Sequence, residues 1–126
     1  DTIMNCLIIL DEFIKNFYPN KKQMLDLANT GHITATDLAD YLVKNYSISF
    51  RKAYVKTSAI VNLAEKRGKS LSQLSLEELR TIEPKLTNEV FKVFDLKNSV
   101  KSKKSYGGTS FENIKKMIMK YKKQND

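Results

Sequence analysis

The sequence predicts an all-α fold, and two kinds of pattern indicate it. Apolar residues recur three and four positions apart along most of the chain, a spacing that places them on one face of a helix. Capping residues, glycines and prolines divide these stretches into separate helices. No segment alternates apolar and polar residues between hairpin turns, so we expect strands to be at most incidental.

The first expected element is the end of a long central bundle helix over residues 1–18, apolar on most of its surface. A helix this apolar must be buried on most sides, so we interpret it as part of a bundle whose other helices lie upstream or on other subunits. The alternative is a central helix that its own domain surrounds. Pro19 ends the pattern, because proline cannot continue the helical hydrogen bonding. The heptad positions are Ile3, Leu7, Leu10, Ile14 and Phe17, and Met4, Cys6, Ile8, Ile9 and Phe13 cover much of the remaining surface.

Residues 19–126 are expected to form a small multi-helix domain. Its first helix covers residues 20–29, and we expect Gly31 to adopt the left-handed conformation that often ends a helix. The next helix begins after Thr34, a candidate cap, and runs for roughly three turns with an Asp40–Lys44 pair on its exposed face. The apolar faces comprise Met24, Leu27 and Ala28 in the first helix and Ala35, Leu38, Ala39, Leu42 and Val43 in the second.

Two further helices have clear boundary signals. Ser49 is expected to cap one helix, which Gly68 ends. Ser75 and Glu78 form the capping-box pattern of the other, which Pro84 stops. The expected inner face of the first comprises Phe50, Ala53, Tyr54, Thr57, Val61 and Ala64. Hydrophobic staples are expected from Leu74 with Leu79, and from Leu86 with Phe91 around a cap at Thr87, before a short helical segment with Val90, Val93 and Phe94.

The last part of the chain is expected to be a loop followed by a helix. Residues 96–108 are rich in Lys and Ser and predict a loop, with Gly107 and Gly108 as its hinge. Thr109 and Glu112 form a second capping-box pattern, which opens the final helix. The residues expected to face inward are Phe111, Ile114, Met117, Ile118 and Tyr121.

Composition limits the class of protein. A length of 126 residues with 41% apolar content is typical of one globular domain. The longest apolar run, residues 6–10, is far shorter than the roughly 20 residues of a membrane span, so we expect no membrane contact. A single cysteine, Cys6, excludes an internal disulfide and fits a reducing, cytoplasmic setting. Lys and Arg outnumber Asp and Glu by 22 to 14, but Lys, Asn and Ile are all plentiful, as in AT-rich genomes. We therefore interpret the net charge of +8 as a solvated basic surface and do not favour a nucleic-acid partner.

The sequence offers little catalytic chemistry. His32 is the only histidine, and its spacing from Cys6 and from acidic pairs fits neither a metal site nor a Cys–His catalytic pair, so we expect no metal and no cofactor. The glycines at 107–108 are interpreted as a sharp turn rather than an anion site, and Glu77 and Glu78 as capping groups. A helix-turn-helix over residues 34–67 is disfavoured, because its second helix has few amides that read bases. We interpret as exposed surface Lys97, Lys101, Lys103, Lys104, Lys115, Lys116, Lys120, Lys122 and Lys123.

Five segments together carry a resemblance to a known family. They are ATDLADYLV at 35–43, Phe50-Arg51 with Ala53, LSLEEL at 74–79, Asn98-Ser99-Val100 and SYGGT at 105–109. In order and spacing they resemble the C-terminal domain of the argininosuccinate lyase family, over essentially the whole chain. The run at 35–43 is specific to this family within the wider fumarase and aspartase superfamily. The chain departs from the family pattern at Tyr54, where His is usual, and at Ser58, where Gly is usual.

The resemblance implies an enzyme, a C–N lyase that cleaves argininosuccinate into arginine and fumarate by β-elimination in arginine biosynthesis. It also implies a cytoplasmic homotetramer, in which the chain's partners are its own upstream domains and sister subunits. The family's catalytic serine lies in a loop of pattern G-S-S-x-M-P-x-K-x-N and its catalytic histidine in a Thr-His pair. Neither pattern occurs in this sequence, and the Tyr, Gln and Lys that bind substrate in the family are expected upstream of Asp1.

We therefore expect the chain to be an inactive C-terminal part of such an enzyme, with no catalytic or substrate-binding residue assigned to it. Thr36, Asp37 and Arg51 are the candidate closure contacts, since exposed helix starts are the parts of a moving domain that can approach bound substrate. The alternative hypothesis is an independent basic helical module that binds nucleic acid or a partner protein. A steep loss of nucleic-acid affinity with salt would distinguish that alternative.

Overall fold

The all-α prediction is confirmed. The computed structural model describes residues 1–125, which contain helices and turns and no strand. No helix in that range combines the length and the apolar content needed to cross a membrane. The α-helices are α1 (Thr2–Lys15), α2 (Lys21–Thr30), α3 (Ala35–Tyr46), α4 (Phe50–Lys66), α5 (Leu76–Arg80), α6 (Phe91–Phe94), α7 (Leu96–Ser102) and α8 (Phe111–Asn125), with 3-10 turns η1 (Leu71–Gln73) and η2 (Asn88–Val90).

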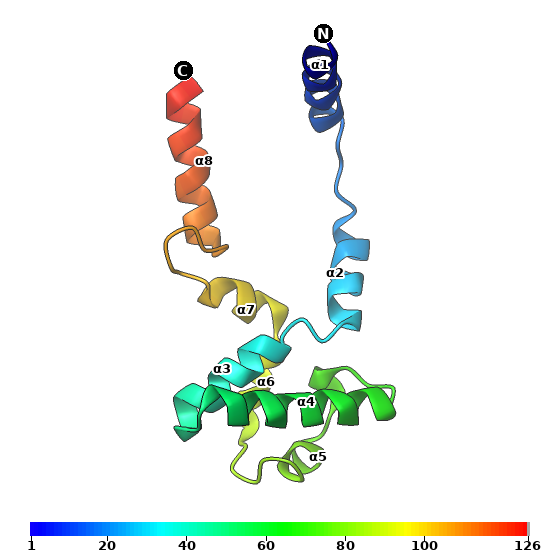
Figure 1. The fold of residues 1–126 in the computed structure, drawn as a ribbon, viewed down its shortest axis with the longest axis vertical. Coiled ribbons are helices and arrows are strands. Elements are labelled where there is room, and N and C mark those ends of the chain that lie inside the picture. The colour runs from blue at the N-terminus through cyan, green and yellow to red at the C-terminus, as the bar shows by residue number, and fades with distance from the viewer. Residues whose placement is uncertain (126) are drawn as a thin grey trace.

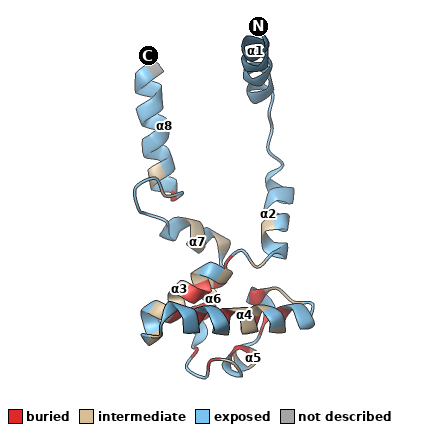
Figure 2. Cartoon of the chain, viewed as in Figure 1, coloured by how far each residue is buried: buried red, intermediate tan, exposed pale blue. Residues whose placement is uncertain are grey.

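Helices α3 and α4 form a hairpin at the centre of the body, joined by residues 47–49 (Figure 1). Leu38 and Leu42 of α3 and Ile60 of α4 are fully buried. Phe50 and Tyr54, predicted to lie on the inner face of α4, are 55% and 61% exposed, so that prediction is wrong and Ile60 fills the interior instead. Buried residues follow α3 to α6 and the turns between them (Figure 2). The core comprises Leu38, Ala39, Leu42, Ala53, Ile60, Ala64, Leu71, Leu74, Leu79, Leu86, Val90 and Phe94.

Local signals determine where α4 begins and ends. The Ser49 hydroxyl accepts a hydrogen bond from the Lys52 backbone N–H at 3.4 Å. At the other end Gly68 has a φ of 60°, a conformation that side chains disfavour. The N–H groups of Gly68 and Lys69 donate to the carbonyls of Glu65 and Ala64, both at 3.0 Å, which satisfies carbonyls at the helix end in the Schellman arrangement. Both predicted boundaries of α4 are confirmed.

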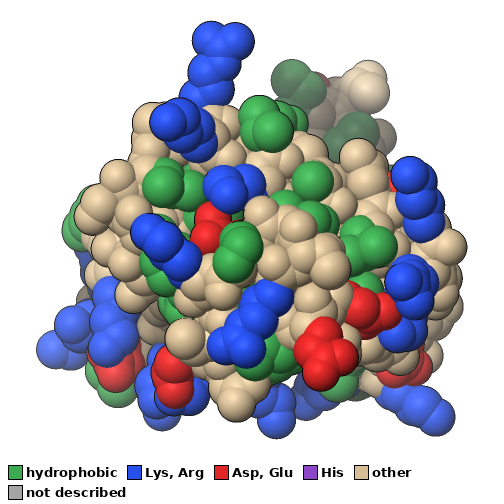
Figure 3. Space-filling view, turned by 90° about the horizontal axis from the view of Figure 1, so that it is seen from below, with side chains coloured by type: hydrophobic (Ala, Val, Ile, Leu, Met, Phe, Trp, Pro, Cys, Tyr) green, Lys and Arg blue, Asp and Glu red, His purple; other side chains and the backbone are tan. Residues whose placement is uncertain are grey.

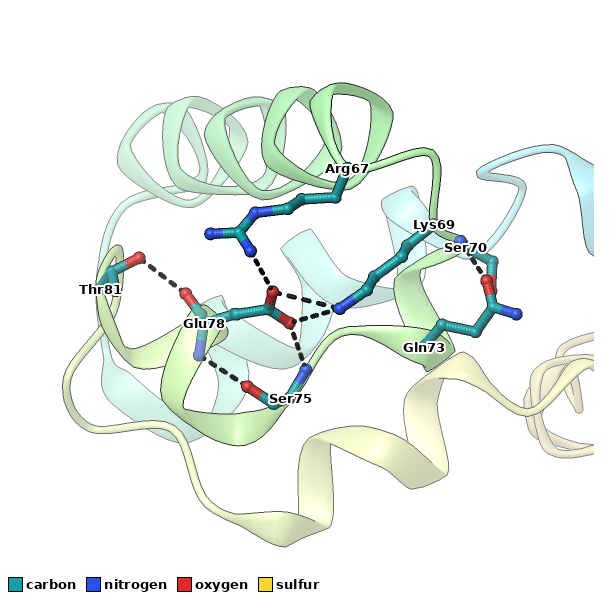
Figure 4. Close-up of polar contacts among 7 residues, drawn as sticks. All are labelled: Arg67, Lys69, Ser70, Gln73, Ser75, Glu78 and Thr81. Carbon is teal, nitrogen blue, oxygen red and sulfur yellow. Dashed lines mark hydrogen bonds and ion pairs between the residues drawn. The ribbon is translucent and has the colours of Figure 1, made fainter.

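The predicted capping box of α5 is also confirmed. The Ser75 hydroxyl accepts a hydrogen bond from the Glu78 N–H at 3.1 Å, and the Glu78 carboxylate accepts one from the Ser75 N–H at 2.7 Å (Figure 4). Leu74 and Leu79, the predicted staple, are both buried in the core. This short helix is therefore fixed at its start by polar and apolar contacts together.

Helices α1, α2 and α8 extend from the body towards the same side (Figure 1). Helix α1 ends at Lys15, ahead of Pro19, and has no buried residue; Ile3, for example, is 73% exposed. The α8 residues predicted to face inward do not do so within this chain, because no described element covers them. They are Phe111, Ile114, Met117, Ile118 and Tyr121, all of them exposed.

Some predicted boundary details around α2, α3 and η2 are wrong. Gly31 follows α2 with extended backbone, at φ −96° and ψ 160°, rather than in the left-handed region. Thr34 and Thr87 precede α3 and η2, but neither side chain makes a capping hydrogen bond. Thr34 is instead buried. The Asp40–Lys44 pair does not occur among the ion pairs of residues 1–125.

The segment predicted as a loop, residues 96–108, is helical over its first half. Helix α7 starts where the Asp95 side chain accepts a hydrogen bond from the Lys97 N–H at 2.8 Å. The sharp turn expected after it is present, with Gly107 at a φ of 76°. The capping box expected from Thr109 and Glu112 does not form, since the Ser110 hydroxyl accepts from the N–H three residues later and caps α8 instead.

Truncation of the core should separate buried from exposed leucines. We expect Leu42→Ala to lower the free energy of unfolding by about 2–5 kcal/mol, because a fully buried leucine leaves a cavity. The matched control is Leu27→Ala in α2, where the leucine is 65% exposed and the loss should stay within about 0.5 kcal/mol. Urea unfolding followed by circular dichroism measures both. Equal losses for the two variants would contradict the assignment of the core.

Candidate functional site

The candidate closure contacts lie at the starts of α3 and α4, and the hairpin keeps them apart. Thr36 and Asp37 are in the first turn of α3, and Arg51 is in the first turn of α4. Because the two helices run in opposite directions, these starts are separated by roughly the length of the 12-residue α3, about 18 Å. Thr36 and Arg51 are exposed, whereas Asp37 is half-buried. The fold therefore does not gather the three residues into one site.

Asp37 is bound within the chain. One of its carboxylate oxygens accepts a hydrogen bond from the Ser99 hydroxyl, and the other binds the Lys103 ammonium. The Asp37 side chain is only 15% exposed. A cavity of about 500 Å³ lies beside these contacts, lined by residues of α3, α6 and α7. This end of α3 is thus joined to α7 and the residue after it by polar contacts between residues that are far apart in the sequence.

Thr36 lines a different cavity, a groove of about 310 Å³ between α3 and α4. The Thr57 hydroxyl at this groove has no hydrogen-bond partner among the described residues, although Thr57 is 5% exposed. Tyr54 and Ser58, where the chain departs from the family pattern, line the same groove. Its lining includes hydroxyl and amide groups but no charged side chain, so it offers hydrogen bonds rather than acid or base catalysis. The lining residues are Ala35, Thr36, Ala39, Phe50, Tyr54, Thr57, Ser58, Val61 and Asn62.

Glu78 binds several donors at the end of α4 (Figure 4). Its carboxylate lies 3.2 Å from the Lys69 ammonium and 3.3 Å from the Arg67 guanidinium. The hydrogen bond from the Ser75 N–H lowers the pKa of Glu78 most; Lys69 and Arg67 lower it further, and partial burial opposes them. These contacts hold α5 against the end of α4, so the carboxylate has a structural role that needs no catalysis.

A second carboxylate, Glu83, forms a largely buried ion pair with Lys56 of α4. The Lys56 ammonium lies 2.7 Å from the Glu83 carboxylate, which is 7% exposed. This contact is the main cause that lowers the pKa of Glu83, the Lys85 N–H adds to it, and burial opposes both. Nearby, the Tyr46 hydroxyl donates to the Lys85 carbonyl at 3.0 Å, and burial raises the pKa of Tyr46 to about 12. The turn after α5 is therefore tied to both helices of the hairpin.

The remaining candidates for chemistry lie apart from one another. The His32 Nε2 is 3.9 Å from a Glu65 carboxylate oxygen, and its Nδ1 has no partner among the described residues. Cys6 is exposed on α1. Residues 1–125 contain no group of three or more His, Cys, Asp and Glu side chains that could hold a metal ion. Seen from below, the surface carries Lys and Arg scattered among hydrophobic side chains, with fewer Asp and Glu (Figure 3).

The body built on α3 and α4 coincides with a region found in known proteins. Residues 32–101, more than half of the chain, match the family described as argininosuccinate lyase C-terminal. The chain belongs to the argininosuccinate lyase family. The matched region contains every residue of the buried core, from Leu38 to Phe94. The resemblance that the sequence motifs carry is confirmed.

Individual argininosuccinate lyases match over nearly the whole chain. That of Pelagibacter ubique is 67% identical over 123 residues, which are 98% of this chain and 27% of that protein. The argininosuccinate lyase of a Nitratiruptor species is 45% identical over 121 residues, 94% of this chain and 26% of that protein. The one from Ehrlichia chaffeensis is 42% identical over 122 residues, 97% and 26% of the two proteins. The chain thus spans about a quarter of the length of these argininosuccinate lyases.

Ser99 and Lys103 are the residues at this site that the sequence did not reveal. The motif around Ser99 contributes to the family resemblance, but nothing in its spacing links it to Asp37, which lies 62 residues earlier. Lys103 is one of the lysines that the sequence assigns to exposed surface, whereas its ammonium is bound to Asp37. Helical spacing pairs residues three or four apart and therefore cannot find such contacts.

Glu78 and Glu83 should make the free energy of unfolding depend on pH. Their pKa values are lowered in the folded chain, so their contribution is fully present above the pKa of an unfolded glutamate, about 4.3, and is lost as the pH falls below it. We expect Glu78→Gln, which keeps the capping pattern without the charge, to be less stable at pH 7 and to lose less stability on acidification than the unaltered chain.

Urea midpoints between about pH 7 and pH 3 measure this effect, across the range in which glutamates protonate. The matched control is Glu77→Gln on the same turn of α5, whose exposed side chain makes no ion pair among those of residues 1–125. A Glu78→Gln profile parallel to that of the unaltered chain would contradict the role assigned to Glu78.

Proposed function

We propose that the chain is the C-terminal domain of an argininosuccinate lyase, and that the complete enzyme splits argininosuccinate into arginine and fumarate by β-elimination. The observation that carries the proposal is the surface of α1. This helix is apolar around most of its circumference and exposed throughout, in a chain that spans about a quarter of its relatives. Apolar surface of that extent is characteristic of an interface. Such an interface supports the proposal that this chain is one domain of a larger C–N lyase.

In the complete enzyme, residues 1–18, with α1, belong to the end of a long central helix of the upstream bundle, and residues 19–126 belong to the small C-terminal domain. The partners of α1 are then the chain's own upstream domains and the sister subunits of a cytoplasmic homotetramer in arginine biosynthesis. The heptad spacing of Ile3, Leu7 and Leu10 supports this assembly, because bundles bury such seams between helices.

The chemistry of the complete enzyme belongs to residues outside this chain. Glu78 and Glu83 are held in ion pairs, and the family's serine-loop and Thr-His patterns do not occur in the sequence. The alternative, an independent module that binds nucleic acid or a partner protein, rests on the net charge of +8 and on the exposed lysines between residues 97 and 123. The family membership and the surface of α1 favour the lyase.

The chain by itself should not turn over substrate. We expect no fumarate release from argininosuccinate even at high protein concentration, because the groups that would remove the proton and expel the guanidinium nitrogen are supplied elsewhere. Fumarate absorbance measures this directly. The full-length lyase from the same source is the positive control, and appreciable turnover by the chain alone would overturn the proposal.

The C-terminal domain also moves over bound substrate in this proposal. Of the three candidate closure contacts, Thr36 and Arg51 are free to meet another part of the enzyme, whereas Asp37 is bound within the chain. The exposure of Thr36 and Arg51 at helix starts supports contact with another part of the enzyme. We expect Thr36→Ala and Arg51→Ala in the full-length enzyme to lower kcat/KM by at least about tenfold, since small misplacements of a closed site are costly. Lys52→Ala, an exposed neighbour of Arg51, is the control and should behave as the unaltered enzyme. Normal kinetics in both test variants would contradict the closure.

A further inference from the structure

The last part of the chain is attached to the body by few contacts. We use the name terminal arm for residues 96–125, which comprise α7, the turn after it and α8. Helix α7 has no buried residue, and within α8 no described side chain is buried either. A segment with so little buried apolar surface depends on its polar contacts for a fixed position.

The polar contacts between the terminal arm and the α3–α4 hairpin converge on one carboxylate. Ser99 and Lys103 donate to Asp37, and the Asn98 amide donates separately to the Lys92 carbonyl of the adjoining α6 at 3.4 Å. Ser99 and Lys103 engage different oxygens of Asp37, so the carboxylate holds two points of the arm at once. Both bonds involve a charged group, which makes them stronger than bonds between neutral groups. We call Asp37, Ser99 and Lys103 the Asp37 latch.

Hydrogen bonds within the turn between α7 and α8 fix the start of α8 relative to Lys103. The Ser110 N–H donates to the Lys103 carbonyl at 3.2 Å, and the Asn113 side-chain amide donates to the Ser105 carbonyl at 2.8 Å. A Cβ atom at Gly108 would lie 2.3 Å from the Lys103 carbonyl oxygen, so only glycine permits the turn to close this tightly. Ser110 itself is 2% exposed. The direction of α8 therefore follows from the position of Lys103.

The latch also connects the arm to the proposed closure. Asp37 directly follows Thr36, which lines the groove between α3 and α4. A displacement of the arm relative to α3 would change where α8 lies with respect to Thr36. Fixing Lys103 and Ser99 to the first turn of α3 makes the two surfaces move together.

We propose that Asp37 is a positioning residue, which locks the terminal arm to α3 so that the arm and the α3–α4 hairpin turn as one rigid unit during closure. Its role is then internal, through Ser99 and Lys103, rather than direct contact with substrate. The part of this inference that concerns closure rests on the proposed function; the lock itself does not.

The lock is tested in the 126-residue chain by pulsed electron paramagnetic resonance. Spin labels are placed at Lys52→Cys in α4 and Met119→Cys in α8, both exposed, in a Cys6→Ser background. We expect a narrow distribution of distances for the unaltered latch, and a distribution at least about twofold broader for Asp37→Ala. The matched control is Asp40→Ala, one turn along α3 and without an ion pair among those described, which should leave the width unchanged. Equal widths for the two variants would overturn the proposal.

Two further variants separate the lock from a general loss of folding. Lys103→Met leaves the body intact, because its side chain is 44% exposed, and should broaden the distribution as Asp37→Ala does. The double variant that exchanges the two residues, Asp37→Lys with Lys103→Asp, should give a narrower distance distribution than Asp37→Lys or Lys103→Asp alone. Failure of both variants to behave in this way would overturn the lock even if Asp37→Ala unfolds the chain.

The link to closure is tested by kinetics of the full-length enzyme. We expect Asp37→Ala to lower kcat by about tenfold with a smaller change in KM, and the exchanged pair to recover part of the loss. If the label distances broaden while turnover stays normal, the link to closure is overturned and the lock stands. If Thr36→Ala and Arg51→Ala are also normal, the closure fails independently of the latch.

Discussion

The packing of α3 against α4 is the constraint on which the rest of the structure depends. Leu38, Leu42 and Ile60 are fully buried, and Ala39 and Ala53, both buried and small, permit the close approach of the two helices. Other elements are placed relative to this hairpin: α5 through Glu78 at the end of α4, the following turn through Lys56, and α7 of the terminal arm through Asp37. A change in the hairpin would therefore move every one of them.

The features that the sequence predicts correctly have local causes. The cap at Ser49, the left-handed Gly68 and the Ser75–Glu78 capping box each involve residues within a few positions of one another, and each forms as expected. A local cause also explains the wrong prediction that Thr109 caps α8. Ser110 is the cap instead, because the choice between the two depends on how tightly the preceding turn closes. Helix starts and ends are thus readable from sequence where no distant group competes.

The features that the sequence does not predict depend on distant partners. The contact of Asp37 with Lys103 joins residues 66 positions apart, and α7 has too few apolar residues to show a helical pattern. The periodicity of α8 correctly indicates an apolar face, but the surface that would cover it is not in the described chain. The prediction that Phe50 and Tyr54 face inward is wrong for a related reason. The apolar face of α4 is wider than the part of it that α3 covers, so both side chains stay exposed. Family membership, by contrast, is carried by motifs spread over the whole chain and is recognisable without the fold.

The extension of α1, α2 and α8 towards one side leaves the opposite face of the body, formed by α4 and α5, unobstructed (Figure 1). Lys52 in α4 and Glu77 in α5 are exposed and take no part in the core. A fluorescent dye or a tether to a sensor chip attached to α4 or α5 would leave the projecting helices unobstructed. Immobilisation through the α4–α5 face therefore presents the exposed apolar side chains of α1 and α8 outward, as an oriented layer.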